Sequence, residues 1–264
     1  MNWTEMILPI ASGFGITVAT MPLFIGYFQI KKYGQEILEE GPNWHRAKAG
    51  TPTMGGTVFL IAIIISALWV AVWQQALTPA LWISLFILLV YGGLGFLDDF
   101  IKIFRKRNMG LNSKQKLIGQ IIGGIIFYAV LVSEGAMNTV NVFGYDLHLS
   151  FLYGLFVIVW LVGFSNAVNL TDGIDGLVSG LGAISFATYA IIAWNQQQYD
   201  ILILCLSVVG ALIGFFGYNH KPAKIFMGDV GSLALGGLLA TISILLHQEW
   251  TLLLIGLVYI VETL

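Results

Sequence analysis

The sequence predicts an all-α, polytopic helical bundle embedded in a membrane. Hydrophobic residues make up 58% of the 264 positions and charged residues only 10%, whereas soluble domains carry about 25% charged residues. The mean hydropathy is +0.86. Apolar runs of about 20 residues, the length that a helix needs to cross a bilayer, also recur along the whole chain. A soluble globular domain is therefore not expected.

Nine apolar segments are predicted to span the membrane. The first, Ile7–Ile30, contains no charged residue and follows an N-terminus without a basic stretch, so we expect a retained helix and not a cleaved signal peptide. A ninth segment begins near Trp250 and is still apolar at Leu264. The seven between them are Thr53–Trp73, Ala80–Leu97, Leu117–Val132, Phe151–Val168, Leu177–Trp194, Ile201–Tyr218 and Val230–Leu246.

The basic residues indicate the orientation of these spans. All twelve Lys and Arg residues fall in the connections after the first, third and seventh spans, which alternation places on one side of the membrane. By the positive-inside rule this side is cytoplasmic and the N-terminus lies outside. No polar linker or clear internal repeat interrupts the pattern, so residues 1–264 are predicted to form a single integral-membrane domain.

Five aspartates belong to the predicted cytoplasmic side, at or near span ends in three different connections. They are Asp98, Asp99, Asp172, Asp175 and Asp229. An ionised Asp at membrane depth costs on the order of 3 kcal/mol, so such acids usually have a partner or a function. Asp98 and Asp99 repel each other unless a cation or proton relieves them, and Lys102 follows Asp98 by one helical turn. The alternative is an interfacial ion pair that marks the end of a span; the adjacent acids favour a function.

The segment SNAVNLTDGIDGL combines polar side chains at regular spacing. Asn166, Asn169, Asp172 and Asp175 recur every third residue, which predicts one stripe if the segment is helical. Gly173 gives the backbone freedom to approach a ligand. Asn, Asp and Gly are also ordinary turn residues, but their regular spacing between two apolar spans favours a binding site.

A third segment, GDVGS, places Asp229 in a Gly-rich turn that enters a helix. Such a turn presents free N–H groups that suit phosphate oxygens, and we expect Ser232 to cap the helix. A carboxylate there is a suitable ligand for Mg²⁺. Lys48, Lys114 and Lys116 either neutralise diphosphate charge or face lipid headgroups. No pair of His or Cys residues has the spacing of a zinc site.

Carboxylates, lysines and Gly-rich turns near one membrane face fit Mg²⁺-dependent phosphoryl transfer, which needs charge neutralisation and positioning more than a reactive side chain. A site at the membrane surface would let a lipid phosphate meet a soluble nucleotide substrate. The residues alone identify neither the sugar nor the nucleotide. A lipid or ion transporter is the alternative from another class, but it predicts acids in mid-span and not at span ends.

These motifs resemble the phospho-N-acetylmuramoyl-pentapeptide transferase (MraY) family, within the polyprenyl-phosphate N-acetylhexosamine-1-phosphate transferase superfamily. GTPTMGG and LNSKQK are more similar to the muramoyl-pentapeptide branch, whereas DDxxK, NxxNxxDGxDG and GDxGS are shared with the superfamily. The matching segments follow the family order and are KAGTPTMGG (48–56), LGFLDDFIK (94–102), LNSKQKLIGQ (111–120), NAVNLTDGIDGL (166–177) and KIFMGDVGSLALGG (224–237).

The resemblance implies transfer of phospho-MurNAc-pentapeptide from UDP-MurNAc-pentapeptide to undecaprenyl phosphate, giving lipid I and UMP with Mg²⁺ in peptidoglycan synthesis. It also implies a homodimer in the bacterial plasma membrane, with the active site on the cytoplasmic face and no nucleic acid among its partners. Transfer of GlcNAc-1-phosphate to the same lipid, by the sister enzymes of the superfamily, stays open as an alternative.

The resemblance also assigns roles to residues. It implies that Asp229 is the metal ligand and that Asp98 and Asp99 bind or activate the lipid phosphate. It also implies that Asn169, Asp172 and Asp175 line the uridine and diphosphate region. The remaining expected substrate contacts are Lys48, Thr53, Lys102, Lys114, Asn166, Gly173, Asn219 and Phe226. We expect direct attack by the lipid phosphate with Asp98 as base; a covalent Asp intermediate is the alternative.

One departure from the family pattern concerns the C-terminal end. The family has ten spans, with a His-rich cytoplasmic segment between the last two, and this sequence ends at VETL inside the predicted ninth span. We therefore expect the domain to be C-terminally incomplete. The hypothesis that follows is an inactive or severely impaired enzyme, or a remnant that binds substrate without turnover.

Overall fold

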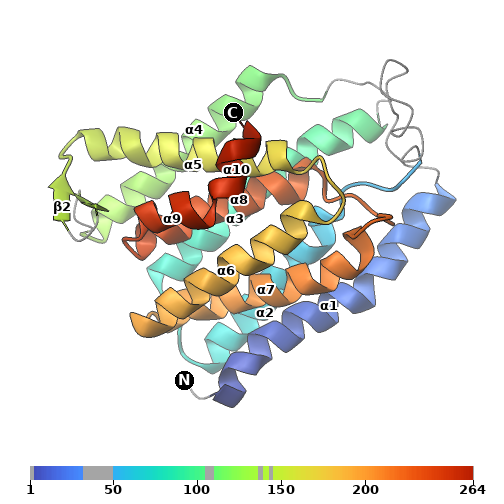
Figure 1. The fold of residues 1–264 in the computed structure, drawn as a ribbon, viewed down its shortest axis with the longest axis horizontal. Helices are drawn as coiled ribbons and strands as arrows, with labels where there is room; N and C mark the ends of the chain where they lie inside the picture. The colour runs from blue at the N-terminus through green and yellow to red at the C-terminus, as the bar shows by residue number, and fades with distance from the viewer. Residues whose placement is uncertain (1–2, 32–49, 105–109, 136–138, 143–144, 264) are drawn as a thin grey trace.

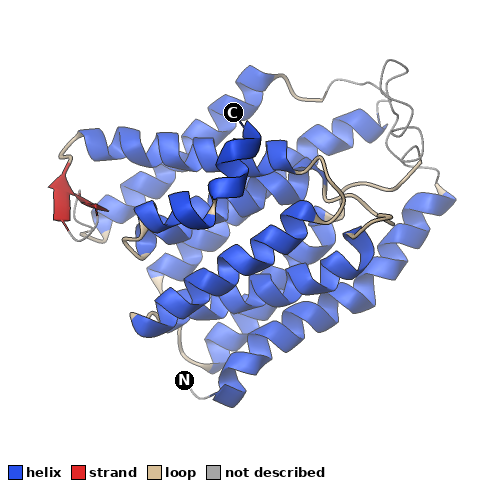
Figure 2. Cartoon of the chain, in the orientation of Figure 1, coloured by secondary structure: helices blue, strands red, loops and turns tan. Residues whose placement is uncertain are grey.

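The computed structural model describes residues 3–31, 50–104, 110–135, 139–142 and 145–263. It consists of ten helices and one short hairpin among these residues (Figures 1 and 2). In chain order the elements are α1 (Trp3–Ile30), α2 (Gly56–Trp73), α3 (Pro79–Phe104), α4 (Ser113–Ser133), β1 (Thr139–Val142), β2 (Tyr145–His148), α5 (Leu152–Thr171), α6 (Leu177–Asn195), α7 (Tyr199–Asn219), α8 (Gly228–Leu245), α9 (Glu249–Ile255) and α10 (Leu257–Thr263).

Eight of these helices, α1 to α8, are long and apolar enough to cross a membrane. They coincide with the first eight predicted spans and confirm the all-α, polytopic class. The predicted ninth span differs, because residues 249–263 form two seven-residue helices instead of one continuous helix. The break is at Gly256, a residue that costs about 1 kcal/mol relative to Ala inside a helix. α10 leaves this point at an angle to α9 (Figure 1).

The hairpin of β1 and β2 was not predicted, since residues 133–150 read only as a connection between spans. The two strands pair antiparallel, with Thr139 opposite His148 and Val142 opposite Tyr145. Val140 is buried, and β1 packs against α9. Figure 1 shows the hairpin at the left end of the bundle, whereas α3 ends at the right.

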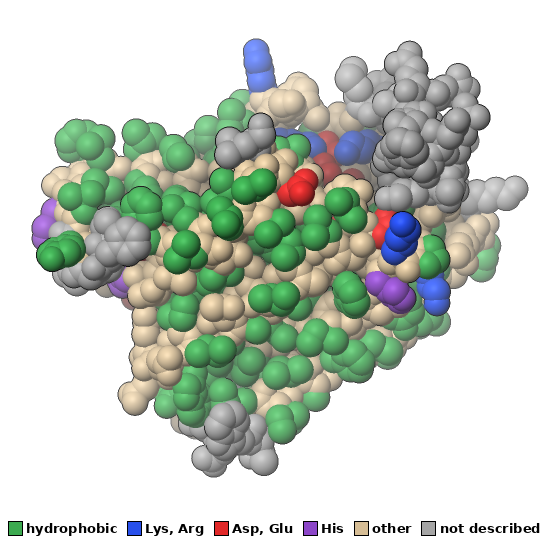
Figure 3. Space-filling view, in the orientation of Figure 1, with side chains coloured by type: hydrophobic (Ala, Val, Ile, Leu, Met, Phe, Trp, Pro, Cys, Tyr) green, Lys and Arg blue, Asp and Glu red, His purple; other side chains and the backbone are tan. Residues whose placement is uncertain are grey.

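The centre of the bundle is formed by α7 and α8, the two most deeply buried spans. α7 packs against α1, α2 and α6, and α8 packs against α3 and α5. Small residues allow close approach: a Cβ on Gly210 of α7 would lie 2.1 Å from the carbonyl oxygen of Ile10 in α1. The outer surface is apolar, as expected of helices that face lipid. Figure 3 shows hydrophobic side chains over most of one face, with acidic and basic ones gathered toward its upper right-hand edge.

Most helix ends differ by a few residues from the predicted spans, and three of these extensions bring charged residues of the candidate site into helices. α3 continues past Leu97 to Phe104, so Asp98 and Asp99 lie within it. α4 begins at Ser113 because Asn112 and Gln115 form a capping box. α8 begins at Gly228, before the predicted Val230. These extra turns carry most of the charged groups of the candidate site.

Candidate active site

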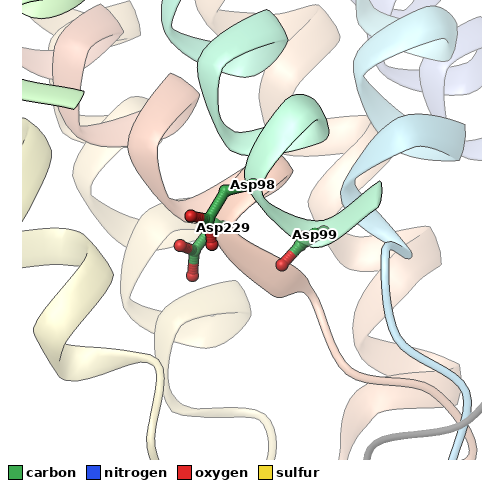
Figure 4. A group of neighbouring side chains, drawn as sticks. All are labelled: Asp98, Asp99 and Asp229. Atoms are coloured by element: carbon green, nitrogen blue, oxygen red, sulfur yellow. The ribbon is translucent and has the colours of Figure 1, made fainter. Parts of the chain in front are cut away.

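Three aspartates from two helices meet at one end of the bundle. Asp98 and Asp99 come from the last two turns of α3, and Asp229 from the first turn of α8; oxygens of the three carboxylates lie within 4.8 Å of one another (Figure 4). Asp98 and Asp99 are buried, and the Oδ1 atom of Asp98 also accepts a hydrogen bond from the backbone N–H of Leu111 at 2.8 Å. Two of the three acidic segments identified in the sequence therefore lie together in the structure.

Two lysines balance the negative charge of this cluster. The Nζ atom of Lys102 lies 2.5 Å from Oδ2 of Asp98 and 3.5 Å from Oδ2 of Asp229. The Nζ atom of Lys116, in the first turn of α4, lies 2.6 Å from Oδ2 of Asp229 and 3.1 Å from Oδ1 of Asp98. Each lysine thus bridges the two helices that supply the acids.

Lys114 and Lys116 were both candidates to neutralise diphosphate charge, but the resemblance gave only Lys114 as a substrate contact. Lys114 is exposed and takes part in none of the ion pairs of the described residues. Residues two apart on a helix point about 200° away from each other, so only one of the two lysines can face the acids. The capping box is a sequence signal for this separation, since it starts α4 early enough to make both lysines helical and so places them on different faces.

Asp99 lies at the N-terminus of α8. Its Oδ2 atom accepts a hydrogen bond from the backbone N–H of Val230 at 3.3 Å, where the helix dipole favours a negative charge. A Cβ on Gly228 would lie 2.4 Å from the same oxygen and 3.1 Å from Oγ1 of Thr53, and Gly228 has a φ of +77°. Glycine is therefore required here, and the predicted residue Thr53 does approach the site.

The four Asn and Asp residues that recur at every third position fall into two groups, because α5 ends at Thr171. Asn169 donates from Nδ2 to Oδ1 of Asp229 at 3.0 Å and to Oγ of Ser232 at 2.8 Å. Asn166 lies on the same helix and contacts Gln120 of α4 (Oε1, 3.1 Å) instead of the acids. The predicted stripe is thus limited to the two asparagines.

Asp172 and Asp175 belong to the turn between α5 and α6, together with Gly173. Burial, and then the negative charges of Asp229 and Asp99, raise the pKa of Asp172 well above its ordinary value. The Oδ2 atom of Asp175 accepts a hydrogen bond from the backbone N–H of Ala223 at 3.3 Å. Gly173 is exposed, and a Cβ there would have nothing within 4 Å, so this part of the turn is open.

The helix-capping role expected for Ser232 is wrong. The residue that precedes α8 is Met227, which makes no side-chain cap, and Ser232 lies inside the helix. Its hydroxyl donates to the carbonyl oxygen of Gly228 at 3.0 Å and accepts from Asn169 at 2.8 Å. Ser232 therefore supports the asparagine that contacts Asp229.

Asn219 and Phe226 organise the connection between α7 and α8. Asn219 is buried, and its Oδ1 atom accepts from the N–H of Gly176 at 3.1 Å and from the hydroxyl of Ser179 at 2.9 Å, while Nδ2 donates to the carbonyl oxygen of Ile225 at 3.0 Å. Asn219 thus ties the turn that bears Asp175 to the segment that leads to Asp229.

The backbone of Phe226 pairs with the predicted GTPTMGG segment: its N–H donates to the carbonyl oxygen of Pro52 at 2.8 Å, and its carbonyl oxygen accepts from Gly55 at 3.0 Å. This pairing brings Thr53 to the beginning of α8. Lys48, the remaining predicted contact, lies outside the described residues.

The cluster has the donor set of a Mg²⁺ site. Mg²⁺ binds proteins through one or two carboxylates together with water and substrate phosphates, and three carboxylates offer oxygens here. The side chain of Asp229 is 19% exposed and that of Asp98 only 1%. Asp229 is therefore the more accessible ligand, and the residues fit the ion.

A bundle of eight helices that are long and apolar enough to cross a membrane, with carboxylates and lysines gathered at one end, is the architecture of an integral-membrane transferase of phosphorylated substrates. Consistent with this class, residues 81–247 match the model of glycosyl transferase family 4, and residues 48–60 match signature 1 of phospho-N-acetylmuramoyl-pentapeptide transferases.

Proteins named phospho-N-acetylmuramoyl-pentapeptide-transferase are similar over nearly the whole chain. Those of Enterococcus hirae and Enterococcus faecalis are 70% and 68% identical over all 264 residues, which cover 82% of each relative. That of Latilactobacillus sakei is 61% identical over 98% of the chain and 81% of the relative. The chain therefore belongs to the phospho-N-acetylmuramoyl-pentapeptide transferase family, an enzyme family, and the resemblance drawn from its motifs is confirmed.

Proposed function

We propose that this chain transfers phospho-MurNAc-pentapeptide from UDP-MurNAc-pentapeptide to undecaprenyl phosphate, with lipid I and UMP as products, at the cluster of Asp98, Asp99 and Asp229. Family membership supports the reaction. The observation that supports the location is the meeting of three carboxylates and two lysines, because phosphoryl transfer depends on charges that are fixed before the reaction begins.

In the proposed mechanism Asp98 is the general base. It is buried between Lys102 and Lys116, and it would take the proton of the lipid phosphate as an oxygen of that phosphate attacks the β-phosphorus of the UDP-sugar. The bond from that phosphorus to the UMP oxygen breaks, and the two lysines stabilise the charge on the transferred phosphoryl group. A direct displacement of this kind needs no covalent Asp intermediate.

Mg²⁺ is the proposed cofactor, with Asp229 as its principal ligand and the neighbouring carboxylates in support. When bound, the ion supplies charge neutralisation for the diphosphate. The hydrogen bond from Asn169 fixes the orientation of the Asp229 carboxylate, whatever ligand occupies the other oxygen.

The proposed substrate contacts lie around the turn between α5 and α6 and around the beginning of α8. The open backbone at Gly173, with Asp172 and Asp175 on either side, is suited to the uridine and diphosphate. Asn166 and Asn219 have their amide groups engaged within the protein, so we assign them support of the site more than contact with substrate. The other proposed contacts are Lys48, Thr53, Lys102, Lys116, Asn169 and Phe226, whereas Lys114 is exposed and lies outside the ion pairs of the cluster.

The distribution of basic residues supports a site on the cytoplasmic face of the bacterial plasma membrane, with the N-terminus outside. A homodimer is proposed on the family resemblance alone. Both proposals are open to direct tests, by cysteine labelling from one side of the membrane for the orientation and by the mass of the detergent-solubilised protein for the assembly.

The central experiment measures UMP release and the lipid product with and without Mg²⁺, for the wild-type chain and for Asp229→Ala. We expect Asp229→Ala to lower the rate at least about 100-fold. Glu134→Gln, an exposed position at the other end of α4, is the matched control and should retain the rate. An Asp229→Ala variant that turns over normally would exclude the proposed site.

The choice between sugars needs a second comparison, in which UDP-MurNAc-pentapeptide and UDP-GlcNAc are supplied separately and the lipid product is identified. A GlcNAc-phospholipid product would favour the sister enzymes of the superfamily. Binding of the UDP-sugar without any lipid product would instead support a chain that binds substrate and lacks turnover.

A further inference from the structure

Three helices of the site meet twice, one helical turn apart. In the upper layer Lys116 of α4 and Asn169 of α5 both contact Asp229 of α8. In the lower layer Gln120 of α4 contacts Ser165 of α5, which in turn contacts the backbone of Leu233 in α8. Each member of the lower layer lies four residues from its counterpart, and residues four apart lie on one face of a helix.

Gln120 is the centre of the lower layer. Its side chain is 1% exposed. Its Nε2 atom donates to Oγ of Ser165 at 3.1 Å, and its Oε1 atom accepts from Nδ2 of Asn166 at 3.1 Å. The hydroxyl of Ser165 donates in turn to the carbonyl oxygen of Leu233 at 3.0 Å. A directional series of hydrogen bonds therefore joins α5, α4 and α8 directly beneath the acids.

The backbone around Gln120 is also held against α3. The hydroxyl of Tyr91 donates to the carbonyl oxygen of Gln120 at 2.9 Å. A Cβ on Gly119 would lie 2.6 Å from the side chain of Leu94, and one on Gly123 would lie 3.2 Å from Val90. Glycine at these positions lets α4 approach α3 closely, so this part of α4 has one defined rotation about its axis.

We propose that Gln120 is a positioning residue that acts through Lys116, an inference that rests on the proposed catalytic role of the site. A lysine side chain has many rotamers, and the position of its ammonium group depends on the direction in which the side chain leaves the helix. Because successive residues differ by about 100° around a helix, a small rotation of α4 would carry Lys116 away from Asp98 and Asp229. Gln120, one turn below on the same face, fixes that rotation.

A double-mutant cycle with Gln120→Met and Lys116→Met tests this inference. Met has a similar length and no hydrogen-bonding group, and both former partners keep another bond, Ser165 to Leu233 and Asn166 to the carbonyl oxygen of Val162. We expect Gln120→Met to lower kcat/KM about tenfold. The double variant should match Lys116→Met to within about twofold, since interacting residues are not additive.

The matched control is Ser243→Ala, which removes another buried polar contact between α5 and α8. The Oγ atom of Ser243 accepts from Nε1 of Trp160 at 2.9 Å, far along both helices from the acids. Its effect should multiply with that of Lys116→Met. If the effects of Gln120→Met and Lys116→Met on kcat/KM multiply in the same way, the proposal is overturned, because Gln120 would then act on the fold in general.

The unfolding temperature of the purified variants provides a readout that is independent of turnover. Loss of Lys116 leaves the negative charges of the acids unbalanced and should change the unfolding temperature. This change should be smaller in the Gln120→Met background than in the wild type. Equal changes in both backgrounds would contradict the proposal. A wild-type chain that forms no lipid product would contradict only the proposed function, since the cycle in unfolding temperature still tests Gln120. If Gln120→Met lowers the yield of folded protein, Gln120→Asn takes its place in the same cycle.

Discussion

A methyl group on Gly95 would lie 2.1 Å from the carbonyl oxygen of Asp229. The backbones of α3 and α8 therefore touch at the residue that bears the proposed metal ligand. Asp98 follows Gly95 by three residues on the same helix, which places its carboxylate next to this contact. The meeting of the acids is thus set by a contact between two backbones, and the side chains only complete it.

The first prediction follows from this contact. Gly95→Ala should push α8 away from α3, lower the stability by about 1–3 kcal/mol and reduce activity more than tenfold. Gly93→Ala, on the same helix, has nothing within 4 Å of the new Cβ and should retain activity while stabilising α3 by up to about 1 kcal/mol. Chemical unfolding and the UMP-release assay measure both; equal effects of the two substitutions would argue against the backbone contact.

A second prediction separates the two lysines of LNSKQK. Lys116→Met should lower kcat/KM by about 100-fold or more, because it removes a charge held 2.6 Å from Asp229. Lys114→Met should change kcat/KM by less than about threefold, because Lys114 is exposed and has no ion pair with the acids of the cluster. Steady-state kinetics with both substrates decides the matter, and a reversed order would favour the original assignment of Lys114.

The eight confirmed spans could be predicted because each is a long apolar run bounded by polar or turn residues, a signal that depends only on local composition. Helix ends were less predictable. Hydropathy ends a span at the first charge, yet α3 continues through Asp98, Asp99 and Lys102. Lys102 forms an ion pair with Asp98, and Asp99 accepts a backbone hydrogen bond from Val230. Because hydropathy ends a span at a charge, both Lys114 and Lys116 fell before the predicted span at Leu117, and the sequence did not decide which of them faces the acids.

Other features were not predictable from local sequence because distant contacts determine them. Asn166 and Asn219 are of a residue type that often binds ligands, but their amides are engaged by Gln120 and Ser179, which lie 46 and 40 residues away in the chain. The hairpin and the break at Gly256 likewise involve short segments, for which the apolar pattern alone gives no clear choice.

A third prediction concerns Asn219. Asn219→Ala leaves the N–H of Gly176 and the carbonyl oxygen of Ile225 without their partner, so we expect a loss of about 1–3 kcal/mol in stability. Asn219→Asp keeps the acceptor for Gly176 and Ser179 and loses only the donor to Ile225. It should therefore destabilise the protein less than Asn219→Ala at moderately low pH, where the carboxyl group is protonated. Thermal unfolding together with the KM for the UDP-sugar tests this role. An Ala variant of normal stability but much raised KM would instead indicate direct substrate contact.

The last prediction concerns Glu249, which begins α9 outside the eight candidate spans. Its side chain is 1% exposed, and neither carboxylate oxygen has a hydrogen-bond partner in the described structure. Burial raises the pKa of Glu249 from 4.5 to about 7. Since the folded-state pKa is the higher one, the stability is fully present below pH 4.5 and declines as the pH rises toward 7, by up to about 3 kcal/mol.

Glu249→Gln has no carboxyl group to ionise and should remove this decline. We therefore expect wild-type protein to unfold at a lower temperature at pH 8 than at pH 5, with a clearly smaller difference for Glu249→Gln and a higher unfolding temperature for this variant at pH 8. Glu134→Gln, at an exposed carboxylate, is the control and should follow the wild type. Identical pH profiles for wild type and Glu249→Gln would mean that Glu249 is buried as a charge with a compensating partner, because only an uncompensated carboxylate resists ionisation inside the protein.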